Sequence, residues 1–322
     1  MVSKEALAAQ IPHILKGTHF QNLGAYYEGK VRDNYTQDKR RILITTDRLS
    51  AFDRIIATIP FKGQVLNALT RFWFENTADI CPNYVQAYPD ANVIVGEECT
   101  PLKVEMVIRG YITGTTGTSA WHNYSKGQRE FGGLTLPDGI KKNQRLPMPI
   151  ITPTTKGNHG DHDHNISPEE IVAKGILTQE EWDELASKTQ LLYARGVEVA
   201  ARQGVILVDT KYEFGRNPEG KIVLIDEIHT PDSSRFWIAS SYADRMERGE
   251  EPENINKEFL RLWLANQGYL GEGPIPEIPE EVIIETAQRY IQAYELITGQ
   301  NFNPEPGDAL PRIEKNLAPY AL

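Results

Sequence analysis

The chain has 322 residues, of which 40% are hydrophobic and 24% are charged, so it is long enough for a sizeable core and for two lobes. Its formal net charge of −10 argues against nucleic acid as the main partner, because a phosphate backbone requires a basic surface. No stretch approaches the roughly 20 apolar residues that a membrane-spanning helix needs, so no membrane partner is expected.

The two cysteines, Cys81 and Cys99, form neither a CxxC pair nor a disulfide framework. A reducing compartment, the cytoplasm, is the simplest interpretation. The first residues, MVSKEALAAQIPHIL, lack the long apolar core of a signal peptide. The sequence does not define the oligomeric state.

The chain is predicted to begin with an amphipathic helix over residues 3–16, followed by three strands between residues 23 and 47. The first two strands meet at a tight turn at Gly29, with Lys30 and Arg32 just beyond it. Such a corner suits a loop that covers a phosphate, because glycine lets the backbone approach and lysine supplies charge. Taken alone, however, it is better explained as an ordinary hairpin with surface charges.

A polar segment and a helix follow. The polar residues of the segment are Asp47, Arg48, Ser50 and Asp53. From Gln64 to Phe74 the apolar spacing predicts a packed helix. Lys62 and Gly63 precede it, where backbone N–H groups could meet an anion; the alternative is a plain loop-to-helix junction.

The run from Pro101 to Tyr111 is predicted to be a strand that carries Glu105 and Arg109. An arginine at the end of a buried strand usually has a fixed anionic partner. The next residues, 112–127, are dense in Gly, Thr and Ser, which suits equally a phosphate-wrapping loop or a linker. We place the boundary here, between a mainly β nucleotide-binding lobe (1–110) and an α+β lobe (111–322) that together form one catalytic unit.

Residues 136–167 are rich in Pro and Gly and are predicted to form a long, ordered loop, a kind of loop that is usually functional. It contains alternating His and Asp residues, including His162 and Asp163. Their spacing fits no standard zinc site, so a polar substrate loop or a plain surface loop is favoured. Two capping boxes, Ser167 to Glu170 and Thr178 to Glu181, then predict helix starts.

Residues 205–237 are predicted to form a hairpin. Alternation along its first strand puts Asp209, Lys211 and Glu213 on one face, where three charges are unfavourable unless they serve a purpose. The second strand ends in Asp226 and Glu227, of which only one can share that face, and we predict Asp226. The cluster suits a divalent cation and a phosphate better than a core.

The chemistry of this hairpin follows from its side chains. Glu213 and Asp226 offer oxygen ligands for Mg²⁺, and Lys211 could neutralise a transferring phosphoryl group. Asp232 offers an anchor, and Arg235 offers a fork for a carboxylate or phosphate. The pattern indicates a Mg-nucleotide site with a second, anionic substrate. It does not distinguish a kinase-like transfer to a hydroxyl from ATP-driven ligation, and a non-catalytic nucleotide-binding protein is the third alternative.

Motifs in a fixed order cover nearly the whole chain. They read GKVRD, TTDRLSAFD, FKGQVLN, VEMVIRGYITG, TPTTKGNHGDHDHNIS, VDTKYEFG and DEIHTPDSSRFW. In these motifs the chain resembles the phosphoribosylaminoimidazole-succinocarboxamide synthase (SAICAR synthetase) family, the ligases of de novo purine synthesis. The last motif is the specific one.

The resemblance implies a two-lobed α+β fold, similar to ATP-grasp and kinase-like nucleotide binders. It implies a ligase that joins L-aspartate to the carboxylate of carboxyaminoimidazole ribonucleotide (CAIR), with ATP converted to ADP and phosphate through an acyl phosphate. The cofactors would be ATP and Mg²⁺, and the partners would be these small molecules.

The resemblance also implies roles for residues. Lys211, Glu213 and Asp226 would be catalytic, with Glu213 and Asp226 holding Mg²⁺ or the nucleotide ribose. The ATP-binding residues would be Gly29, Lys30, Arg32 and Glu105. The substrate-binding residues would be Ser50, Asp53, Lys62, Arg109, Thr115, Ser119, His162, Asp163, Asp232 and Arg235.

The chain departs from the family pattern at three places. Ile225 stands where the family often has Gly before Asp-Glu, and Lys156-Gly157-Asn158 stands where many members have Lys-Ala-Glu. Extra residues after the central Tyr-x-Thr-Gly leave either Thr115 or Ser119 as the substrate hydroxyl.

Overall fold

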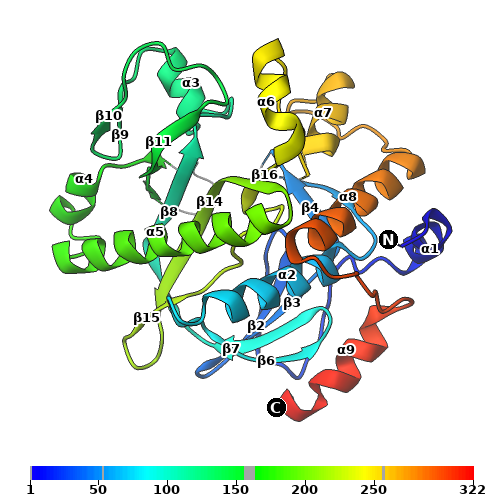
Figure 1. Cartoon of the computed structure of the whole chain (residues 1–322). Coiled ribbons are helices and arrows are strands. Elements are labelled where there is room, and N and C mark those ends of the chain that lie inside the picture. The colour runs from blue at the N-terminus through cyan, green and yellow to red at the C-terminus, as the bar shows by residue number, and fades with distance from the viewer. Residues whose placement is uncertain (1, 53, 156–163, 256–257) are drawn as a thin grey trace.

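The computed structural model describes residues 2–52, 54–155, 164–255 and 258–322. Two antiparallel sheets, each covered by helices, form the body of the molecule (Figure 1). The predicted α+β class is therefore confirmed. Among the helices described, none is both long enough and apolar enough to cross a membrane.

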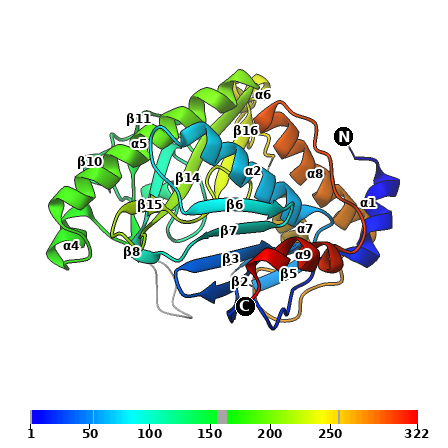
Figure 2. The same ribbon diagram turned by 90° about the horizontal axis from the view of Figure 1, so that it is seen from below.

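The first sheet has the strand order β1-β2-β3-β7-β6. Its strands are β1 (Ala25–Glu28), β2 (Arg32–Gln37), β3 (Arg40–Thr45), β6 (Val85–Asp90) and β7 (Val93–Glu97). Alternate residues of β3 point to opposite faces: Leu43 joins the core under helix α2 (Lys62–Thr77), whereas Ile42 and Ile44 pack with helix α9 (Ala309–Leu317). Figure 2 shows α2 and α9 beside this sheet.

The second sheet is built around two twelve-residue strands, β8 (Thr100–Tyr111) and β14 (Val205–Arg216). Its order is β13-β12-β8-β14-β15, with β11 also paired to β8 and β16 also paired to β14. The shorter strands are β11 (Arg145–Ile151), β12 (Thr154–Thr155), β13 (His164–Asn165), β15 (Ile222–Leu224) and β16 (Ser234–Ile238). Helix α5 (Gln179–Arg202) lies across β8 and β14 (Figure 1).

The predicted hairpin is present as β14 and β15, joined by a turn in which Asn217 N–H donates to Lys221 O. The pairing of β16 with the other end of β14 was not predicted, and residues 225–233 leave the sheet between β15 and β16. A turn closed by Ser234 N–H to Thr230 O, with Pro231 inside it, leads into β16. We call residues 226–232 the acidic segment, because they include Asp226, Glu227 and Asp232.

Both predicted capping boxes are present, at the starts of α4 (Pro168–Ala173) and α5. The predicted helix over 3–16 is too long: α1 spans Lys4–Gln10, and residues Ile11–His13 form a 3₁₀ turn. Pro12 explains this, because it cannot continue the helical hydrogen bonds. The remaining helices are α3 (Ala120–Ser125), α6 (Ala239–Arg248), α7 (Glu258–Asn266) and α8 (Glu280–Thr298), and a 3₁₀ turn follows α9 at Ala318–Tyr320.

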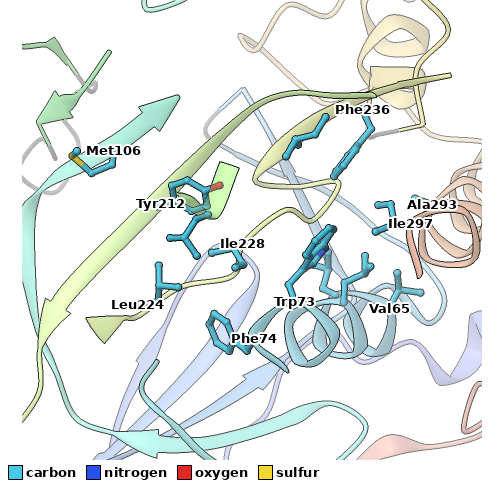
Figure 3. Close-up of a cluster of buried hydrophobic side chains, with 14 of the residues drawn as sticks. Val65, Trp73, Phe74, Met106, Tyr212, Leu224, Ile228, Phe236, Ala293 and Ile297 are labelled. Carbon is cyan, nitrogen blue, oxygen red and sulfur yellow. The ribbon is translucent and has the colours of Figure 1, made fainter. Parts of the chain in front are cut away.

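Two small hairpins complete the fold, β4 (Arg48–Ala51) with β5 (Arg54–Thr58), and β9 (Glu130–Phe131) with β10 (Leu134–Thr135). The largest core lies between α2, α8 and the second sheet. It includes Trp73 of α2, Met106 of β8, Tyr212 of β14, Ile297 of α8, and Ile228 from the segment between β15 and β16 (Figure 3). Strand β8 belongs to the second sheet, although all but its last residue falls within the predicted first lobe. The division into lobes at 110 stays a prediction.

Candidate functional site

A row of charged side chains runs along neighbouring strands β8 and β14. Glu105 lies opposite Glu213, and Arg109 lies opposite Asp209. Lys211 lies between Asp209 and Glu213 on β14, and it donates hydrogen bonds to Glu105 Oε1 at 3.0 Å and to Glu213. These contacts confirm that Lys211 and Glu213 share a face of the strand.

The first sheet contributes Arg32 to the same place. Arg32 donates to Asp226 Oδ1 at 3.1 Å and to Glu227, so a residue of β2 holds both acids that follow β15. Asp226 interacts electrostatically with Lys211 and Glu213, whereas Glu227 interacts with Lys62 and Asp232. The structure therefore agrees with the expectation that Asp226, rather than Glu227, faces Lys211.

Burial and repulsion perturb the pKa values of this cluster. Burial, together with repulsion by Glu213, raises the pKa of Asp226, although Arg32 and Lys211 oppose the rise. Lys211 keeps a raised pKa because attraction to Glu213 and Glu105 exceeds the effect of its own burial. Its side chain and that of Asp226 remain 31% and 29% exposed, so a substrate can reach both.

The donor set fits a divalent cation. In the described chain, the ion pairs of this cluster join four carboxylates (Glu105, Glu213, Asp226 and Glu227) to Lys211 and Arg32, which leaves an excess of negative charge. No group of three His, Cys, Asp or Glu side chains among the described residues could hold a metal alone. Mg²⁺ usually takes one or two carboxylates, waters and phosphate oxygens, so Glu213 and Asp226 are sufficient protein ligands.

Lys62 and Asp232 are brought together from distant parts of the sequence. Lys62 is fully buried at the start of α2, and its Nζ lies 2.7 Å from Asp232 Oδ2. The hydroxyl of Tyr290 on α8 donates to Asp232 Oδ1 at 2.5 Å. Both predicted substrate residues thus have protein partners, and Asp232 is anchored from two sides.

Arg109, at the end of β8, has the anionic partner that was predicted for an arginine at the end of a buried strand, and this partner is Asp209. Arg109 Nη1 lies 3.7 Å from Asp209 Oδ2, and Arg235 Nη1 lies 2.5 Å from the same oxygen. Arg109 also donates to Thr152 Oγ1 and to the carbonyl of Thr118. Burial lowers the pKa of Arg109 to about 10, and Arg235 adds to the effect by repulsion.

Arg235 lines a cavity of about 270 Å³ next to the loop after β8. The lining residues are Thr113, Gly114, Thr115, Thr116, Lys142, Arg235, Trp237, Glu251, Asn254, Arg261 and Leu262. The lining carries three basic side chains (Lys142, Arg235 and Arg261) and one acidic side chain (Glu251), so the cavity suits an anionic group. Thr115 belongs to this lining, whereas Ser119 is buried behind it, with its hydroxyl 2.7 Å from Thr116 Oγ1.

Gly114 allows the close packing of this lining. Its φ is +90°, and a Cβ there would lie 2.5 Å from Ser119 Oγ and 3.0 Å from Arg235 Nη2. A larger residue would therefore displace the guanidinium from the cavity.

The backbone of the Gly29 turn is hydrogen bonded to the side chain of Arg48. Buried Arg48 donates to the carbonyl of Gly29 at 2.9 Å and to Asp33 at 2.7 Å. A Cβ at Gly29 would lie 2.8 Å from the carbonyl of Arg32, so the tight turn requires glycine. Lys30 is exposed on this turn.

The backbone at the start of α2 is bound by a carboxylate of the protein itself. The N–H of Gly63 donates to Asp47 Oδ1 at 2.9 Å, and Asp47 also accepts from the N–H of Leu15. Of the two interpretations left open for this segment, the contact favours the plain loop-to-helix junction. Burial raises the pKa of Asp47 to about 6. Asp47 thus replaces a ligand as the cap of this helix.

Of the predicted site residues not yet placed, the structure describes Ser50, which is partly buried in the β4–β5 hairpin, whereas Asp53, His162 and Asp163 lie outside the described residues. The sequence pattern missed Arg48, Tyr290 and the pairing of Asp209 with both arginines. Asp209 stood on the charged face of its strand, which was a usable signal, but Tyr290 looked like any aromatic residue of an amphipathic helix.

Comparisons with known proteins agree on one family. A family model described as SAICAR synthetase matches residues 25–274. The chain is 51% identical over 310 residues to "Putative phosphoribosylaminoimidazole-succinocarboxamide synthase 2" of Agrobacterium fabrum, covering 95% of this chain and 98% of that protein. It is 54% identical over 298 residues to the Legionella pneumophila (strain Lens) phosphoribosylaminoimidazole-succinocarboxamide synthase, covering 91% and 95%. Among solved structures, "SAICAR-synthase from Saccharomyces cerevisiae complexed SAICAR" is similar with a TM-score of 0.78 and 31% identity, covering 90% of this chain and 100% of that one.

Proposed function

The chain belongs to the SAICAR synthetase family, and we propose that the clusters around Lys211 and Arg235 are the two ends of its active site. It is an ATP-dependent ligase of de novo purine biosynthesis, which joins L-aspartate to the carboxylate of CAIR and yields SAICAR, ADP and phosphate. The observation that carries the proposal for the site is the row of charges along β8 and β14.

The nucleotide phosphates would lie at the Lys211 end. Glu213 and Asp226 would hold Mg²⁺, which would supply positive charge to the phosphate oxygens. The Gly29–Lys30 turn and the ammonium of Lys211 would supply further positive charge. Glu105 accepts from Lys211 and from Thr154 Oγ1 at 2.8 Å, so its proposed role is to orient Lys211 rather than to bind ATP directly.

The ribonucleotide phosphate would occupy the cavity at the Arg235 end. Arg235 offers a bidentate fork there, and the Gly114–Thr116 loop offers hydroxyl and backbone donors. From Asp209 to Glu213 the strand rises about 13 Å, a span that a nucleotide-sized substrate can bridge. The substrate carboxylate would thereby reach the Lys211 end. Roles for Ser50, Asp53, His162 and Asp163 stay predictions.

The proposed reaction has two steps. A carboxylate oxygen of CAIR attacks the γ-phosphorus of ATP, ADP leaves, and an acyl phosphate forms. The amine of aspartate then attacks the acyl carbon, and phosphate leaves with one of the former carboxylate oxygens. The protein supplies orientation and charge neutralisation, which carry most of the catalysis in such transfers.

We propose that the protein works in a reducing compartment such as the cytoplasm, because Cys81 and Cys99 are both buried and unpaired. We also propose that residues 1–110 and 111–322 act as one catalytic unit, because Arg32 of the first range binds Asp226 and Glu227 of the second.

Release of ADP with a panel of amino acids tests this function. We expect ADP only when CAIR, L-aspartate, ATP and Mg²⁺ are all present, with SAICAR formed in equal amount. ADP formation that needs no amino acid, or phosphate found on a hydroxyl of the product, would favour a phosphotransferase instead.

A further inference from the structure

His229 lies within the acidic segment, two residues after Glu227 and three before Asp232, yet it points into the core. Its side chain is fully buried, and its ring meets the indole of Trp73 edge-on, with the centroids 4.5 Å apart. Its Nε2 is hydrogen bonded to the hydroxyl of Tyr212 at 2.5 Å. Figure 3 shows Tyr212 of β14 and Trp73 of α2 in one cluster of buried hydrophobic side chains.

Tyr212 links this contact to the reacting groups. It stands between Lys211 and Glu213 on β14, and its side chain points to the opposite face of the strand. The acidic segment is therefore attached to β14 from the core side, directly behind the residues that Asp226 must approach.

Three unfavourable features are retained at His229. Its φ is +53°, a conformation that side-chain-bearing residues rarely adopt. Its Nδ1 is buried and has no hydrogen-bond partner among the described residues. Helix α5 carries Gly196 beside it, where a Cβ would lie 2.6 Å from His229 Cε1, so a helix interior keeps a glycine to make room for the ring. An apolar side chain would fill the same space without an unpaired nitrogen, which points to a need for this imidazole.

We propose that His229 is a positioning residue. Its neutral imidazole, bound to Tyr212, fixes the acidic segment so that Asp226 and Glu213 lie close enough to bind the same Mg²⁺ beside Lys211. This inference rests on the proposed function, since it assumes that Glu213 and Asp226 hold Mg²⁺ for ATP. Burial lowers the pKa of His229 to about 3, so the ring stays neutral and retains this hydrogen bond at the pH of the cell.

Four variants separate positioning from simple packing. Tyr212→Phe removes only the hydroxyl, and His229→Asn tolerates the positive φ but is too short to reach Tyr212. His229→Gln places an amide near the position of Nε2. Tyr124→Phe is the matched control, because its buried hydroxyl bonds to Pro137 O and to the N–H of Ile140 in a separate core cluster.

The readouts are kcat, the Mg²⁺ concentration for half-maximal rate, and the Mg²⁺-dependent affinity for ADP by calorimetry, all below the melting temperature of each variant. We expect Tyr212→Phe and His229→Asn each to lower kcat about 10- to 100-fold. Both should weaken Mg²⁺-dependent ADP binding. Their double variant should be no worse than either alone, and His229→Gln should recover most of the loss.

The inference is overturned if Tyr212→Phe and His229→Asn lower only the melting temperature, as Tyr124→Phe is expected to do. Additive losses in the double variant would also overturn it, because the two residues would then act separately. If His229→Asn does not fold, Tyr212→Phe and His229→Gln decide the outcome. A wild-type protein without ligase activity refutes the proposed function instead, and the ADP affinities alone then decide the role of His229.

Discussion

Arg32 and Asp226 lie 194 positions apart in the sequence, and their side chains meet at 3.1 Å between the two sheets. The same guanidinium also binds Glu227. The nucleotide end of the site is therefore assembled only when both sheets are in place, and the charge at Asp226 depends on a residue of the other sheet.

Arg32→Lys tests this relationship. Lysine keeps the positive charge, but it lacks the planar fork that contacts two carboxylates at once. We expect kcat to fall about tenfold or more and the half-activating Mg²⁺ concentration to rise, because Asp226 loses its fixed position. Arg248→Ala on the exposed end of α6 is the control. The measurement is steady-state kinetics at varied Mg²⁺ concentration. If Arg32→Lys has the kcat and half-activating Mg²⁺ concentration of the wild type, Arg32 does not position Asp226.

Lys211→Ala and Asp226→Asn test the catalytic end directly. Lys211→Ala removes the charge that would neutralise the transferring phosphoryl group, so kcat should fall about 10³-fold or more. Asp226→Asn should abolish Mg²⁺-dependent turnover, since the amide is a poor magnesium ligand. Circular dichroism should show an intact fold in both, and a near-normal rate in either variant would mean that this part of the sheet is structural.

Gly114→Ala and Gly117→Ala form a matched pair in one loop. A Cβ at Gly114 would meet Ser119 and Arg235, whereas a Cβ at Gly117 would meet no atom of the described part of the chain within 4 Å. Gly114→Ala should therefore raise the KM for CAIR about tenfold and destabilise the fold by about 1–3 kcal/mol. Gly117→Ala should leave both unchanged. Equal KM values for the two variants would place the ribonucleotide elsewhere.

The stability of the protein should depend on the protonation of His229. The pKa of its imidazole is lowered to about 3 by burial, whereas an unfolded histidine titrates near pH ~6.5. Below that pH the unfolded state binds a proton that the native state excludes, so the free energy of unfolding falls by up to about 1.4 kcal/mol per pH unit. The effect is absent above pH ~6.5 and grows as the pH decreases.

Urea unfolding of the wild type and of His229→Gln, from about pH 7 to about pH 5, measures this contribution. The wild type should lose more stability on acidification than the variant does. Parallel pH profiles would show that the buried imidazole contributes nothing to the acid sensitivity.

Local patterns predicted the elements well. Alternation placed Lys211 and Glu213 on one face of β14, and two capping boxes marked the starts of α4 and α5. These features depend on residues close in sequence, so a single sequence contains them.

Contacts between distant segments could not be predicted in this way. The register that sets Glu105 opposite Glu213 joins strands about a hundred residues apart, and no local period encodes it. Lys62 stands just before a predicted helix, and no local pattern shows that it is buried against Asp232 and Tyr290. The pairing of β16 with β14 was not predicted for a related reason, because β16 joins the end of β14 that lies away from β15.

The central claim is that ATP activates the carboxylate of CAIR by phosphorylating one of its oxygens. CAIR labelled with ¹⁸O in that carboxylate tests it most directly, with mass spectrometry of the phosphate released during ligation. We expect each phosphate to carry one labelled oxygen and the new amide to keep the other, because phosphate leaves with an oxygen of the former carboxylate. Unlabelled phosphate, with the displaced labelled oxygen found in water instead, would contradict the claim.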